Sequence, residues 1–75
     1  MPSKNDIIQS LVRKIGLSKR EASEVLQVVL DEICKILSKG QELKLTGFGK
    51  FLVKESRGQK VPKFKPGRVL KDAVK

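Results

Sequence analysis

The stretch that most constrains the fold is residues 43–53, where apolar and lysine side chains alternate on both sides of a glycine-rich centre. Leu43 and Leu45 alternate with Lys44, and Phe51 and Val53 alternate with Leu52 and Lys54, a period of two that is typical of strands with one buried face. Between them, residues 46–49 contain two glycines, which mark a tight connection with unusual backbone angles. We therefore predict a β-hairpin with one apolar face and one lysine-bearing face.

A second hairpin is predicted to follow directly. Arg57-Gly58 can form a two-residue turn, and this turn makes Ser56 face Gln59. The resulting register pairs Phe51 with Phe64, Val53 with Pro62, and Glu55 with Lys60 on the apolar face. An aromatic pair and an opposite-charge pair both favour this register. Because proline cannot donate a ladder hydrogen bond, the third strand should lie at the sheet edge.

Helices are predicted before and after these strands. Ser3 is a good N-cap for a helix over residues 4–15, and Ser18 begins a capping box for a helix over residues 19–39. The second helix has an apolar stripe wide enough to contact both the first helix and a second subunit. A short helix over residues 68–74 completes an α+β fold: a helical hairpin, a three-stranded antiparallel β-sheet and a C-terminal helix, in a single domain spanning residues 1–75.

Positive charge is concentrated in the second half of the chain. The formal net charge is +9, with 17 basic and 8 acidic residues. Residues 1–42 hold seven basic and six acidic residues, whereas residues 43–75 hold ten basic and two acidic ones. A surface of this kind attracts polyanions, so nucleic acid is the favoured partner. The alternative is a solvated basic face that only aids solubility.

The residue sets that catalysis needs are missing. The chain has no histidine, and it shows no nucleophile–base pair, metal-ligand cluster or Walker-type glycine loop. Its one cysteine, Cys34, cannot form an internal disulfide, which fits a reducing compartment. No apolar run reaches the ~18 residues of a transmembrane helix, and the N-terminus lacks a signal-peptide core. We expect a cytoplasmic protein that is not an enzyme and needs no cofactor, metal or membrane.

The order of these parts resembles the HU/integration host factor family of bacterial histone-like DNA-binding proteins, and HU most of all. The resemblance covers nearly the whole chain. It is carried by Leu-Thr-Gly-Phe-Gly-Lys-Phe at residues 45–51 and by Val-Pro-Lys-Phe-Lys-Pro-Gly-Arg-Val-Leu-Lys-Asp-Ala-Val-Lys at residues 61–75. It implies an intertwined homodimer, or a heterodimer with a paralogue. Helices would form the base of this dimer, and sheets would form a saddle for double-stranded DNA.

The chain departs from that family at the DNA-wrapping arm. The family extends a long β-ribbon from strands two and three, and a proline in an Arg-Asn-Pro tip wedges between base pairs. Here only residues 57–60 lie between Ser56 and Val61, and Asn-Pro occurs nowhere. Either a short turn near residues 57–60 replaces the arm, or the sequence as written omits it. The regular pairing of the flanking residues favours the short turn.

Candidate DNA contacts come from two sources. The resemblance places four basic residues on the DNA-facing flank of the saddle: Lys65, Arg68, Lys71 and Lys75. It adds Lys4 as a further flank contact, and it implies that the turn with Gly47 and Gly49 brings its backbone close to a phosphate. The strand register alone adds Lys50, Lys54 and Lys63. Any one of these lysines can equally be a solvated surface charge, so the hypothesis concerns the set.

The leading functional hypothesis is a nucleoid protein that binds double-stranded DNA without strong sequence preference. Lys and Arg would contact phosphates, and without arms the protein should bend DNA only slightly. The alternative is a dimeric scaffold or interaction module that lost its DNA binding together with the arms. Binding to single-stranded RNA fits less well, because it uses exposed stacking aromatics and all three phenylalanines occupy predicted core positions.

Overall fold

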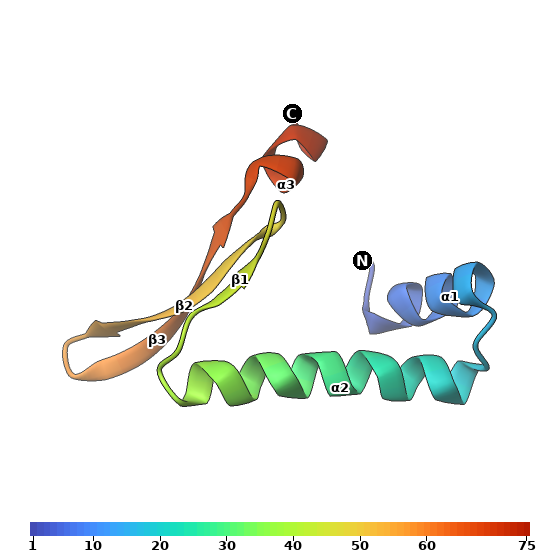
Figure 1. Ribbon diagram of the computed structural model, residues 1–75, viewed down its shortest axis with the longest axis horizontal. Coiled ribbons are helices and arrows are strands. Elements are labelled where there is room, and N and C mark those ends of the chain that lie inside the picture. The colour runs from blue at the N-terminus through green and yellow to red at the C-terminus, as the bar shows by residue number, and fades with distance from the viewer. The chain divides into compact units, whose positions relative to one another are not determined.

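The computed structural model describes residues 1–75, and it contains the predicted elements in the predicted order (Figure 1). These are α1 (Lys4–Ile15), α2 (Lys19–Ser38), β1 (Leu43–Leu45), β2 (Gly49–Ser56), β3 (Gln59–Pro66) and α3 (Arg68–Ala73). Helices α2 and α3 each end one residue before the predicted boundary. The chain forms two compact units, Met1–Glu32 and Ile33–Lys75. None of the helices is long and apolar enough to cross a bilayer.

Local hydrogen bonds explain the bounds of α1. At its start, the Asp6 carboxylate accepts a hydrogen bond of 2.6 Å from the Ser3 backbone N–H. At its end, Gly16 takes a left-handed conformation with a φ of 81°, and its N–H donates to the Val12 carbonyl at 3.1 Å. Only glycine adopts this conformation without strain, so α1 stops where the sequence predicts.

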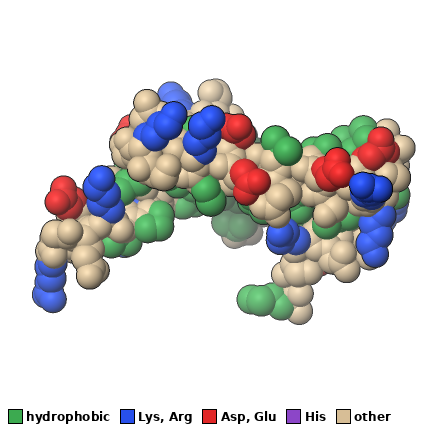
Figure 2. All heavy atoms as spheres, turned by 90° about the horizontal axis from the view of Figure 1, so that it is seen from below, with side chains coloured by type: hydrophobic (Ala, Val, Ile, Leu, Met, Phe, Trp, Pro, Cys, Tyr) green, Lys and Arg blue, Asp and Glu red, His purple; other side chains and the backbone are tan.

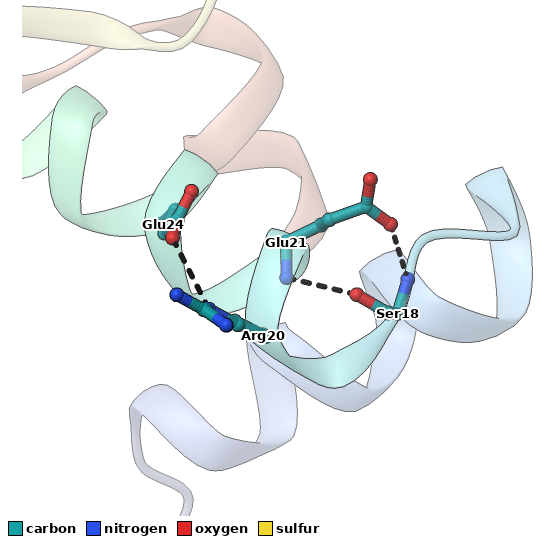
Figure 3. A network of polar contacts seen from close by, with 4 residues as sticks. All are labelled: Ser18, Arg20, Glu21 and Glu24. Atoms are coloured by element: carbon teal, nitrogen blue, oxygen red, sulfur yellow. Dashed lines mark hydrogen bonds and ion pairs between the residues drawn. The ribbon is translucent and has the colours of Figure 1, made fainter.

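Helix α2 begins with a complete capping box (Figure 3). The Ser18 N–H donates to the Glu21 carboxylate at 2.9 Å, and the Glu21 N–H donates to the Ser18 hydroxyl at 3.1 Å. The hydrogen bond from the Ser18 backbone N–H, followed by the smaller contribution of the Ser18 hydroxyl as a donor to the carboxylate, lowers the pKa of the Glu21 carboxyl from its ordinary value. Arg20, in the same first turn, forms an exposed ion pair of 3.7 Å with Glu24. The predicted start of this helix is therefore confirmed at atomic detail.

The first unit is held by a small apolar core between α1 and the start of α2. Its buried side chains are Ile8, Ala22 and Leu26, and four partly buried side chains pack around them: Leu11, Val12, Leu17 and Leu30. On the rest of the α2 stripe, Val25, Val28 and Val29 stay exposed. Figure 2 likewise shows hydrophobic side chains at the surface beside Lys and Arg. One side of the stripe thus packs on α1, whereas these three valines remain exposed.

The sheet in the second unit is antiparallel with the order β1-β2-β3, so β3 lies at an edge as predicted. In the β2–β3 hairpin, Phe51 pairs with Phe64, and the other predicted pairs follow: Val53 with Pro62, Glu55 with Lys60, and Ser56 with Gln59. Arg57 and Gly58 form the connecting turn, with φ angles of 52° and 77°. Positive φ at both central positions is the signature of a type I′ turn. The predicted register is confirmed.

The backbone of this turn is strained at Arg57, which is the only non-glycine residue with a positive φ. Asparagine tolerates this conformation better than arginine and is preferred at the first central position of a type I′ turn. We expect Arg57→Asn to raise the free energy of unfolding by about 0.5–1 kcal/mol, and Gly58→Ala to lower it by about 1 kcal/mol. Urea unfolding of both variants measures these changes. A loss of stability in Arg57→Asn would contradict the turn geometry.

The three phenylalanines gather on the apolar face of the sheet. The ring centroids of Phe51 and Phe64 lie 4.8 Å apart, and those of Phe48 and Phe64 lie 5.6 Å apart. However, Phe48 and Phe64 remain 45% and 38% exposed. The expectation that all three are core residues is therefore wrong for an isolated chain. A sheet needs a second packed layer to bury its apolar face, and a chain of 75 residues is marginal for completing one alone.

Candidate nucleic-acid interface

The face of the sheet opposite the phenylalanines carries five lysines. Residues that alternate with Phe51 and Phe64 point to this other face, because successive side chains of a strand point to opposite sides. The lysines that share it are Lys44, Lys50, Lys54, Lys63 and Lys65. The three candidates that the register predicted, Lys50, Lys54 and Lys63, are thus brought together with Lys65.

Three of these lysines form a row across the sheet. Lys50 in β2 lies directly opposite Lys44 on one side and Lys65 on the other. Like charges directly opposite each other destabilise a sheet. A bound anion relieves this repulsion, so the row favours a negatively charged partner.

A hollow lies next to this row, between the β1–β2 turn and the start of α3. It is lined by the row and by Gly47, Gly49 and Arg68, among others. Two backbone bonds hold its walls together: the Gly67 N–H donates to the Phe48 carbonyl at 2.7 Å, and the Val69 N–H donates to the Gly47 carbonyl at 2.9 Å. The turn and α3 therefore form one fixed frame, which positions Arg68 beside the lysine row.

Gly47 and Gly49 in the β1–β2 turn have different structural roles. Gly47 is exposed and has a φ of 85°, a conformation that L side chains rarely adopt. Gly49 is buried, and a Cβ atom there would lie 2.5 Å from the Phe64 ring and 2.8 Å from the Lys65 carbonyl oxygen. Gly47 thus allows the turn itself, whereas Gly49 allows Phe64 to pack against the backbone. Both line the hollow, but only Gly47 leaves its backbone exposed.

The remaining candidates are more dispersed. Lys71 belongs to α3, and Lys75 follows that helix and forms an exposed ion pair of 3.9 Å with Asp72. Lys4 starts α1 in the other compact unit, and its ammonium donates to the Gln27 side-chain oxygen at 3.2 Å. The structure thus groups the candidates of the sheet and α3 in one unit and leaves Lys4 in the other.

Sequence reasoning missed Lys44. It completes the lysine row and lines the hollow with Lys50 and Lys65. The signal was present, because the alternation of Leu43-Lys44-Leu45 already assigns Lys44 to the lysine-bearing face. Its importance depends on Lys50 as its cross-strand neighbour, and that pairing required the register of β1 on β2.

Most of the positive charge has no acidic partner. The chain has 17 basic residues, and only Arg20, Lys50 and Lys75 form ion pairs. On the lysine face, Lys50 alone is paired, with Glu42 at 3.6 Å. The field of this face therefore remains strongly positive.

The sequence model of the family "Bacterial DNA-binding protein" matches residues 2–60. The chain belongs to this family. Integration host factor subunit alpha of Anaeromyxobacter sp. (strain Fw109-5) is 35% identical over 88 residues, which cover 96% of this chain and 89% of that protein. HU of Geobacillus stearothermophilus is 37% identical over 89 residues, which cover 97% of this chain and 99% of that protein. The resemblance to HU and integration host factor is thereby confirmed.

Solved structures of bacterial DNA-binding proteins of this family share the fold. HU from Thermotoga maritima superposes with a TM-score of 0.84 at 36% identity, covering 99% of this chain and 100% of that chain. A cocrystal structure of Anabaena HU with DNA gives a TM-score of 0.83 over 97% of both chains, at 22% identity. The second likeness concerns the fold alone. The matching family is one of DNA-binding proteins and is not an enzyme family.

Proposed function

We propose that this chain is a nucleoid protein that binds double-stranded DNA through phosphate contacts, without reading the base sequence. The observation that carries the proposal is the segregation of the sheet into an aromatic face and a face with five lysines. Lysine side chains neutralise phosphates but read no bases, so they position a protein on DNA without specifying a site. The proposed contacts are Lys4, Gly47, Gly49, Lys50, Lys54, Lys63, Lys65, Arg68, Lys71 and Lys75, together with Lys44.

We further propose that the chain is a single HU-like domain that functions as a dimer, most simply a homodimer. The exposed valines of α2 and the half-exposed phenylalanine cluster support this, because both are apolar surfaces that a second subunit can cover. Sedimentation equilibrium at micromolar concentration tests it, and we expect twice the 8.4 kDa of the chain. A folded monomer at that concentration would overturn the dimer.

A salt titration of duplex binding separates DNA binding from the scaffold alternative. If phosphates are the ligands, the logarithm of the association constant falls linearly with the logarithm of the salt concentration, with a slope of about −0.9 per phosphate neutralised. For six or more contacts, the affinity should fall about 10³-fold between 50 and 200 mM salt. A scaffold without DNA activity would show no binding at low salt. An affinity that does not depend on salt would rule out the electrostatic mechanism.

We propose that the short β2–β3 turn limits DNA bending. The alignment with Geobacillus stearothermophilus HU runs over 89 residues, more than the 75 of this chain, so that relative carries residues that this chain lacks. The two-residue turn at Arg57-Gly58 supports placing this difference at the arm. Sharp bending of a 20–30-bp site costs about 1–6 kcal/mol, which arms and intercalating wedges normally offset.

We therefore expect little shortening of a duplex of about 30 base pairs in an end-to-end energy-transfer measurement at saturating protein. The matched comparison is a variant with a long β-ribbon inserted between Ser56 and Val61, which should restore both bending and affinity. A large shortening with the unmodified chain would show that another element opens the base steps.

A further inference from the structure

Glu42 is placed to compete with DNA for the central lysine of the row. Its carboxylate lies 3.6 Å from the Lys50 ammonium, and the two side chains are 58% and 38% exposed. Glu42 directly precedes β1, and its ion pair with Lys50 brings its carboxylate to the lysine face. No other carboxylate forms an ion pair with a lysine of this face.

We infer that Glu42 is a built-in competitor that weakens DNA binding at Lys50. In the free chain, Glu42 offsets part of the repulsion between Lys50 and its neighbours Lys44 and Lys65. When a phosphate approaches the row, Lys50 exchanges this carboxylate for the phosphate, and the uncompensated Glu42 then repels the phosphate. Both effects lower the affinity of the protein for any polyanion, and neither changes which DNA sequences the protein prefers.

The inference rests on the proposed function, since Glu42 can compete only if duplex DNA occupies the lysine face. Glu55 provides a matched control within the same hairpin. It lies on the opposite face of the sheet, across from Lys60, and it forms no ion pair. Glu42→Gln and Glu55→Gln therefore change the net charge equally, but only the first frees Lys50.

The test is a fluorescence anisotropy titration of a labelled duplex of about 30 base pairs at about 0.1 M salt. Because exposed ion pairs contribute up to about 1 kcal/mol, we expect Glu42→Gln to tighten binding about two- to fivefold more than Glu55→Gln does. In a Lys50→Gln background, Glu42→Gln should gain no more than the control. This loss of coupling distinguishes competition from a general charge effect.

Every other result of this titration contradicts either the role of Glu42 or the proposed DNA binding. Equal effects of Glu42→Gln and Glu55→Gln, or an undiminished effect in the Lys50→Gln background, overturn the role of Glu42 and leave DNA binding intact. If Glu42 only stabilises the fold, Glu42→Gln lowers the melting temperature without tightening binding, which also overturns it. If the unmodified chain binds no duplex at low salt, the proposed function fails, and the inference fails with it.

Discussion

Replacing Lys65, Arg68 and Lys71 together by Glu should abolish duplex binding while the fold survives. Lys65 ends the lysine row, Arg68 lines the adjacent hollow, and Lys71 follows on α3. All three side chains are exposed, so their reversal disturbs no core packing. The change converts three attractive phosphate contacts into repulsive ones. We expect a loss of affinity on the order of 10³-fold, equivalent to about 4 kcal/mol.

The control for this variant carries the same charge change elsewhere. Lys14, Lys35 and Lys39 are exposed and lie on or directly after the two long helices. Their replacement by Glu should weaken binding far less, because these residues are not part of the proposed interface. The salt dependence is a second measurement: each lost phosphate contact should reduce the slope of the logarithm of the association constant against the logarithm of the salt concentration by about 0.9 in magnitude. Equal losses in the two triple variants would mean that net charge alone, and not the sheet and α3, determines binding.

The second large effect is expected at Phe64, the centre of the aromatic cluster. Its ring contacts both other phenylalanines and lies against Gly49, where no side chain could fit. We expect Phe64→Ala to lower the free energy of unfolding by about 3–5 kcal/mol, the usual range for a buried phenylalanine. The full value is expected although Phe64 is 38% exposed in one chain, because a second subunit should cover this face.

Urea unfolding at fixed protein concentration measures this loss, and Phe64→Leu is the matched control. Leucine keeps most of the apolar volume, so it should lose less than half as much stability as alanine does. A loss below about 1 kcal/mol for Phe64→Ala would mean that the ring stays in water in the assembled protein. The dimer proposed from the apolar surfaces would then have to use α2 without the sheet.

Much of the fold could be predicted from the sequence because its determinants are local. Capping bonds at Ser3 and Ser18 span three residues, and Gly16 ends α1 through its own backbone conformation. The same holds for the β2–β3 register: once Arg57-Gly58 forms a two-residue turn, each pair up to Phe51–Phe64 follows by counting. Alternation along the strands also assigns the lysines to one face.

Other features were decided only by tertiary structure, because they depend on residues that are distant in the sequence. Whether the phenylalanines are buried depends on a second layer, which alternation within a strand does not reveal. The close fit of Gly49 against Phe64, and the bond from Gly67 to Phe48, arise where β3 and α3 return to the β1–β2 turn. These contacts shape the hollow beside the lysine row.

The pairing of Glu42 with Lys50 also depends on residues that are distant in the sequence. In the sequence, the hairpin register assigns Glu55 to the apolar face, but no pairing assigns Glu42, which precedes the first strand. The position of Glu42 appears only when β1 aligns on β2 and brings its carboxylate to the lysine face. Which face is basic follows from the sequence, because side-chain direction in a strand has a period of two. The tertiary structure decided which lysines are neighbours and which acid opposes them, because cross-strand distances depend on register.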